Sequence, residues 1–112
     1  MDMRLYPRMY TSLPMKYQVG LLESTETWDG EGILKNISSG GAYFTCDAHL
    51  PLEAGDVGNF RFTATYPSHL NRQQKSLFKA VGVVVRVDKP ADDHAACGFA
   101  VKFITQLQIS QV

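Results

Sequence analysis

The sequence predicts an all-β domain, and three features of its pattern predict this class. Six segments alternate apolar with polar residues, which is the period of a half-buried strand. Clusters of glycine, proline, asparagine and aspartate separate these segments, and no stretch has the apolar spacing of a long helix. Such a pattern is typical of a small antiparallel barrel or sandwich. The predicted strands cover residues 13–19, 31–38, 42–46, 60–66, 81–87 and 98–104.

The first three strands are bounded by recognisable turn residues. Pro14 lies early in the first strand, which indicates a strand start or a sheet edge. Residues 20–30 are polar and contain two glycines, so we expect a long hairpin connection there. Gly40 and Gly41 join the second strand to the third, and we expect them to supply positive φ in a tight hairpin.

The last three strands carry large apolar side chains at alternate positions, which predicts one buried face for each. These residues are Phe60, Phe62, Ala64 and Tyr66 in the fourth strand, Val81, Val83, Val85 and Val87 in the fifth, and Phe99, Val101 and Phe103 in the last.

The remaining segments predict connections. Residues 67–75 are polar and predict a loop or a short helix, and residues 88–96 predict a turn. Residues 105–112 have no pattern that decides their structure.

Composition limits the class of function. The chain has 112 residues, with 11 basic and 11 acidic side chains. This balance argues against sequence-independent nucleic-acid binding and against a basic patch for anionic membranes. No apolar run approaches the ~20 residues of a transmembrane helix, and the N-terminus lacks an apolar signal segment. We therefore expect a cytoplasmic domain that does not insert into membranes.

The two cysteines predict thiols in a reducing compartment rather than a disulfide framework. Cys46 and His49 have the Cys-x-x-His spacing, and His94 and Cys97 have its mirror image, so together they could form a Cys2His2 zinc site. Cysteines at strand ends are more often small buried residues. We therefore expect no metal site.

Two further motifs are candidates for ligand binding. Arg4 and Arg8 form an R-x-x-x-R motif near the N-terminus. Asn36, Ser38 and Gly41 form an N-x-S-x-x-G motif where the second strand ends. Taken separately, the arginines could be solvated charges and the second motif could be ordinary turn chemistry.

Together, these motifs and the predicted strands resemble the PilZ family of bacterial receptors for the second messenger cyclic di-GMP. The resemblance extends to Leu13-Pro14 at the start of the first strand, to the turn Glu53-Ala54-Gly55-Asp56, and to the last hairpin with Gly98 and Phe99. It implies a six-stranded antiparallel PilZ-type β-barrel with a flexible N-terminal arm. The corresponding domains are an arm at 1–12 that clamps the ligand, a barrel at 13–104 and a tail at 105–112.

The resemblance also implies a site and its chemistry. Arginine forks onto phosphate oxygens or the guanine edge and can stack on a purine, so Arg4 and Arg8 would close over the ligand. Residues 36 and 38 of one strand point to the same face, so Asn36 and Ser38 would meet the same base. Gly41 would allow the backbone to approach the ligand. Members that bind a ligand dimer tend to have an arginine where this chain has Met3, so we expect one ligand per site.

The resemblance implies a receptor and not an enzyme. Ligand binding would order the arm and change a surface that a partner protein reads in trans, and no cofactor is needed. The alternative is a PilZ-like adaptor that binds proteins but not cyclic di-GMP. A single-stranded nucleic-acid barrel is a third interpretation, because tyrosines could stack bases, but the zero net charge counts against it.

Overall fold

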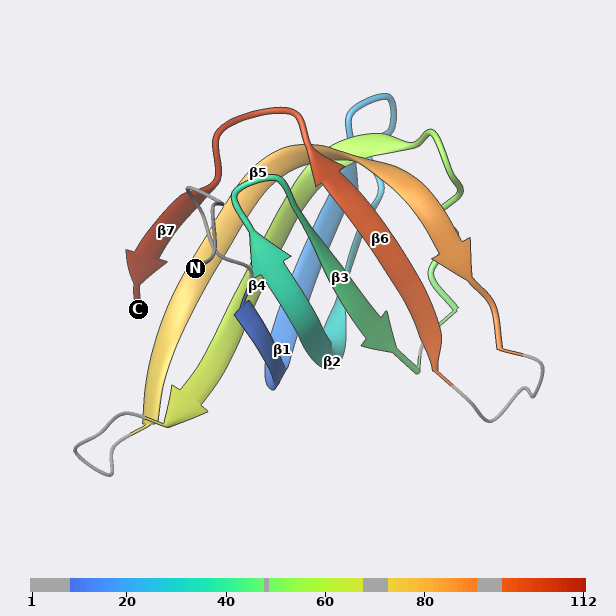
Figure 1. The fold of residues 1–112 in the computed structure, drawn as a ribbon. Helices are drawn as coiled ribbons and strands as arrows, with labels where there is room; N and C mark the ends of the chain where they lie inside the picture. The colour runs from blue at the N-terminus through green and yellow to red at the C-terminus, as the bar shows by residue number, and fades with distance from the viewer. Residues whose placement is uncertain (1–8, 48, 68–72, 91–95) are drawn as a thin grey trace, which may run out of the picture.

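The computed structural model describes residues 9–47, 49–67, 73–90 and 96–112, and every regular element among them is a β-strand (Figure 1). The predicted all-β class is confirmed. The strands are β1 (Met9–Leu21), β2 (Thr27–Ser38), β3 (Gly41–Cys46), β4 (Val57–Pro67), β5 (Gln73–Asp88), β6 (Cys97–Phe103) and β7 (Gln108–Gln111).

Six of these strands close into an antiparallel barrel. The sheet runs β4-β1-β2-β3-β6-β5, and the pairing of β4 with β5 closes it. The seventh strand, β7, pairs with β5 from Ser76↔Gln111 to Lys79↔Gln108 and so lies outside the closed ring (Figure 1). The six-stranded barrel is confirmed, and part of the undecided segment 105–112 is an added edge strand.

The barrel interior is filled mainly by aromatic side chains. Phe44 is fully buried, and its ring centroid lies 5.1 Å from that of Phe62, 5.3 Å from Phe99 and 6.0 Å from Tyr17. These rings come from four different strands, so one cluster ties β1, β3, β4 and β6 together. The alternation predicted for the fourth and sixth strands accounts for Phe62 and Phe99.

In β5 the buried face differs from the predicted row of valines. Phe78, Ala80 and Val84 are buried, whereas Val85 is 52% exposed. The pairing with β6 shifts register between Val84 and Arg86, and this bulge moves Val87 back toward the core. Because apolar residues occupy both faces of this segment, alternation alone cannot identify the inner one.

The first strand begins four residues earlier than predicted. Met9 pairs with Ile37 and Tyr10 with Asn36, and the register then shifts before Leu13. Ser12 lies within this irregularity at φ 47°, in the left-handed region that a residue other than glycine seldom adopts. The bulge interrupts the alternation, which explains why the pattern revealed only the part of β1 after it.

Tyr17 makes the barrel sensitive to alkaline pH. Its side chain is buried, and burial, followed by the charge and hydrogen bond of Cys46 and the charge of Asp29, raises its pKa from 10.0 to about 12. The folded state therefore holds this proton more tightly than the unfolded state does. Its contribution, at most about 3 kcal/mol, is complete below the unfolded pKa and lost as pH rises through the folded pKa.

We expect the free energy of unfolding in urea to fall between about pH 10 and about pH 12, and to fall less in a Tyr17→Phe variant. Equal losses in the two proteins would show that Tyr17 titrates normally.

Candidate functional site

The β2–β3 hairpin carries three of the five predicted ligand-binding residues. Asn36 and Ser38 lie at the end of β2, and Gly41 is the first residue of β3. Ile37 is buried between Asn36 and Ser38, so strand alternation places those two side chains on the opposite, partly exposed face.

All three residues line one hollow of about 480 Å³. The opposite wall comes from β5 and β6, and it adds two cations, Arg86 and Lys102, that the sequence did not single out. Lys102 lies between the apolar Val101 and Phe103, which marks it as a residue of the outer face, but nothing local singles out Arg86, and only the register brings either cation to the hairpin. The pairing of Gly41 with Lys102 places Lys102 directly across from the motif.

Arg86 is held in a cluster with Tyr43 and Asp88. The Tyr43 hydroxyl donates to Asp88 Oδ2 at 2.8 Å, and Arg86 Nε donates to Asp88 Oδ1 at 3.0 Å and to Oδ2 at 3.2 Å. The guanidinium lies over the Tyr43 ring, 5.6 Å from its centroid. These contacts fix the guanidinium at the edge of the hollow.

Arg86 and Asp88 each stabilise the charged form of the other. The hydrogen bond from Tyr43, followed by that from Arg86, lowers the pKa of Asp88, while the bond to Asp88 raises the pKa of Arg86. Burial, followed by the hydrogen bond to Asp88, raises the pKa of Tyr43. At neutral pH the cluster therefore holds a carboxylate, a guanidinium and a neutral phenol.

Ser38 has a structural role in the hairpin as well as a place in the hollow. Its Oγ accepts a hydrogen bond of 3.2 Å from the backbone N–H of Gly40. A hydroxyl that accepts one bond still has its own proton to donate. Ser38 can thus hold the turn and donate to a ligand at the same time.

The predicted role of the hairpin glycines in supplying positive φ is wrong. Among the described glycines, only Gly55 has positive φ, at 99°. Gly41 is required for another reason, because a Cβ there would collide with the carbonyl oxygen of Val101 in β6. Its missing side chain therefore allows β3 and β6 to pair closely below the hollow.

A Gly41→Ala variant is expected to lose about 1–3 kcal/mol of unfolding free energy, because the obstructing atom belongs to the backbone. Gly40→Ala is the matched control, since its Cβ would meet nothing nearer than Ser38 Oγ at 3.9 Å. Urea unfolding of both variants measures the difference. Equal unfolding free energies for the two variants would mean that β3 and β6 can move apart enough to fit the methyl group without loss of stability.

Arg4 and Arg8, the other two predicted residues, lie outside the described residues. One relation to the hairpin follows from covalent structure, because Arg8 is bonded to Met9 and the Cα of Met9 pairs with Ile37. Ile37 separates Asn36 from Ser38. The first described residue of β1, Met9, is therefore opposite the motif.

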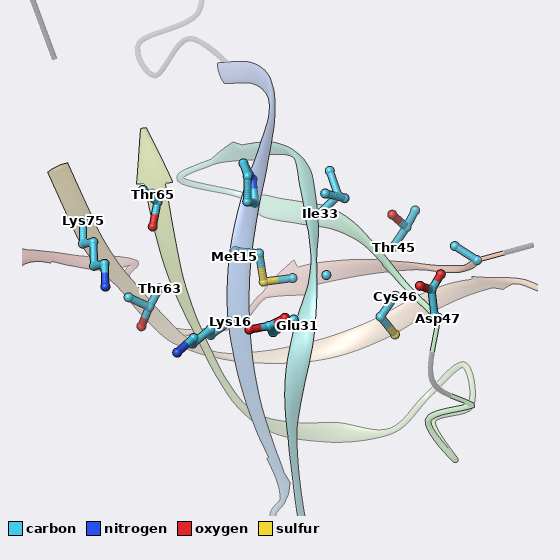
Figure 2. A pocket seen from close by; sticks show the side chains of 13 residues that line it. Met15, Lys16, Glu31, Ile33, Thr45, Cys46, Asp47, Thr63, Thr65 and Lys75 are labelled. Carbon is cyan, nitrogen blue, oxygen red and sulfur yellow. The ribbon is translucent and has the colours of Figure 1, made fainter. Parts of the chain in front are cut away.

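The structure describes a second hollow, of about 470 Å³, at the other end of β3 (Figure 2). Thr45, Cys46 and Asp47 lie at one side of it, and Thr65 and Lys75 lie at the other. It contains none of the predicted ligand-binding residues.

The zinc interpretation gains no support from the described residues. They contain no group of three or more His, Cys, Asp or Glu side chains arranged to hold a metal ion, and His94 lies outside them.

The described residues also form no helix long and apolar enough to cross a membrane.

Comparison with known proteins agrees with the barrel fold. The sequence model of the PilZ domain matches residues 2–112. The chain belongs to the PilZ domain family. A comparison with curated proteins gives no match.

Among solved structures, the PilZ chain is similar to the Bacillus subtilis inhibitor of motility, MotI/DgrA, with a TM-score of 0.52 and 19% sequence identity. The match covers 95% of the PilZ chain and 44% of the other, so this chain spans less than half the length of that protein. At this identity the similarity supports the fold alone. PilZ domains are regulatory receptor or adaptor domains, so the family assigns this chain to regulation.

Proposed function

We propose that this PilZ domain is a receptor for cyclic di-GMP. The observation that carries the proposal is the hollow at the β2–β3 hairpin, where Asn36, Ser38 and Gly41 meet the cations Arg86 and Lys102. The ligand has two phosphates and two guanines, so it needs positive charge and hydrogen-bonding groups side by side. This hollow supplies both.

In the proposed complex, Arg4 and Arg8 bind phosphate or the guanine edge from the N-terminal arm. A guanidinium suits either partner because it is always charged and forks onto two acceptors. The entry of the chain into β1 opposite Ile37 supports an arm that reaches the hollow.

The hairpin side chains read the base. Asn36 offers a donor and an acceptor, and Ser38 retains a proton to donate beyond its bond with Gly40. Both project from a strand that is paired on each side, so they are positioned before the ligand arrives. Lys102 contributes positive charge that attracts the phosphates, whereas the charge of Arg86 is largely balanced by its ion pair with Asp88.

Binding would act as a switch rather than as catalysis. Ordering the arm costs ~1–2 kcal/mol of backbone entropy per residue, so a micromolar dissociation constant is expected. The closed arm would change the surface that a partner protein reads in trans. We place this exchange in the cytoplasm, with no enzymatic step, no cofactor and no membrane insertion.

Isothermal titration of the purified chain with cyclic di-GMP tests the proposal, with GTP and cyclic di-AMP as controls. We expect selective binding with one ligand per site, in keeping with Met3 ahead of the arginine motif. Absence of heat and of any melting shift at saturating ligand would refute the receptor function. The domain would then be a protein-interaction adaptor that does not bind cyclic di-GMP.

Ser38→Ala is expected to weaken cyclic di-GMP binding by about 1 kcal/mol, or roughly fivefold, since it removes one hydrogen bond. Ser39→Ala is the matched control, because Ser39 is exposed and does not line the hollow. Titration of both variants gives the comparison, and melting curves report any loss from the Gly40 contact. If Ser38→Ala binds like the wild type, the guanine is read elsewhere.

A further inference from the structure

Cys46 and Cys97 are directly opposed in the β3–β6 ladder. Cys46 is the last residue of β3, Cys97 is the first residue of β6, and their Cα atoms are register partners. Both are thiols, and both are buried. Directly opposed residues of antiparallel strands project to the same face, so both side chains enter the same side of the sheet.

The backbone already has the spacing of a disulfide. Opposed Cα atoms in an antiparallel pair lie ~4.5 or ~5.5 Å apart, and disulfides form across ~4.4–6.8 Å. A bond between the two sulfurs therefore needs side-chain rotation but no separation or slippage of the strands.

Two polar side chains contact the pair. His49 Nδ1 lies 4.0 Å from Cys97 Sγ, and Cys46 is one of the groups that raise the pKa of Tyr17. The thiolate is the reactive form of cysteine, so a neighbouring imidazole that accepts the Cys97 proton favours reaction. His49 is exposed and can pass that proton to water.

Small reagents can approach each cysteine from a different side. Cys46 and Ala96 line the hollow of about 470 Å³ at this end of β3, whereas Cys97 is 6% exposed and lies beside the exposed His49. Figure 2 shows Cys46 between Thr45 and Asp47 on that wall. This hollow differs from the proposed nucleotide site, which adjoins the opposite end of the same ladder, where Gly41 pairs with Lys102.

We propose that Cys46 and Cys97 form a reversible intramolecular disulfide in response to peroxide. The Cys97 thiolate, its proton taken by His49, attacks a peroxide oxygen, and the O–O bond breaks. One oxygen of hydrogen peroxide stays on Cys97 as a sulfenic acid. The other leaves as hydroxide and becomes water when His49 returns the proton. The Cys46 thiol then attacks the Cys97 sulfur and the sulfenic oxygen leaves as a second water. Two thiols are oxidised, one peroxide is reduced, and a dithiol reverses the change.

The test is oxidation of the reduced, folded chain by hydrogen peroxide without denaturant. After quenching, the protein is unfolded, alkylated and analysed by mass spectrometry. We expect both cysteines to escape alkylation and a Cys46–Cys97 cross-linked peptide to appear. Apart from any methionine oxidation, the mass of the treated chain should be lower than that of the reduced chain by two hydrogens. Dithiothreitol should restore two alkylatable thiols, and the oxidised barrel should melt at least about 5 °C higher than the reduced one.

Variants assign the roles. In Cys46→Ser, Cys97 should accumulate as sulfenic and sulfinic acids. In Cys97→Ser, Cys46 should remain a thiol. His49→Asn should slow oxidation at least about tenfold. Two alkylated cysteines after peroxide treatment of the wild type would overturn the proposal, as would disulfide-linked dimers or sulfinic acid without a cross-link. The mass measurement on the wild type decides even if a cysteine variant fails to fold. Its result does not depend on whether the domain binds a nucleotide.

Discussion

Replacing Phe44 by alanine is expected to lower the free energy of unfolding by about 3–5 kcal/mol, the largest stability change among these predictions. Phe44 is fully buried and its ring contacts rings from three other strands, so its removal leaves a cavity with rigid walls. Urea unfolding monitored by circular dichroism measures the loss. Since a small domain is stable by only about 5–15 kcal/mol, the variant should be close to unfolding.

Val85→Ala is the control for this core prediction. Val85 is 52% exposed at the β5 bulge, so its loss should cost less than about 1 kcal/mol. If Val85→Ala were as destabilising as Phe44→Ala, the valine row would face the core and the bulge would be misplaced.

Replacing Arg8 by alanine is expected to weaken cyclic di-GMP binding by about 1–3 kcal/mol, which is roughly 5- to 150-fold. In the proposed complex, Arg8 supplies a bidentate contact to the phosphate or to the guanine edge. Isothermal titration measures the loss. The melting temperature without ligand should stay unchanged, because Arg8 precedes the first strand of the barrel.

Arg61→Ala removes the same charge from the exposed face of β4, where the side chain does not line the hairpin hollow. It should bind cyclic di-GMP like the wild type. Equal losses in the two variants would mean that net charge, and not the clamp, determines affinity. A large fall in the melting temperature of Arg8→Ala would make Arg8 a structural residue.

The strands that were easiest to predict are those with one clean apolar face. In β6, Phe99, Val101 and Phe103 alternate with smaller or charged residues, and all three are buried as expected. In β5, apolar residues occupy both faces, so alternation did not identify Phe78, Ala80 and Val84 as the inner set. The bulge after Val84 then returns Val87 toward the core. The start of β1 was missed for a related reason, since the irregularity at Ser12 breaks the period.

In the candidate site too, some residues could be predicted from local spacing and others only from the pairing of distant strands. Asn36, Ser38 and Gly41 belong to one hairpin, so local spacing was enough to propose them as a unit. Arg86 and Lys102 lie at least 45 positions after Gly41 in the sequence, and nothing local connects them to the motif. The role of Gly41 also depended on a distant residue, because the atom that excludes a side chain is the carbonyl oxygen of Val101.

Local period and short spacings were enough to predict the all-β class, the positions of most strands, the hairpin motif and the family. The buried face of β5, the cations that line the hollow and the pairing of Cys46 with Cys97 became known only from the folded chain. Each of these depends on register between strands far apart in the chain. A shift of one residue in that register would exchange the two faces of a strand, and no local pattern specifies it when both faces are apolar.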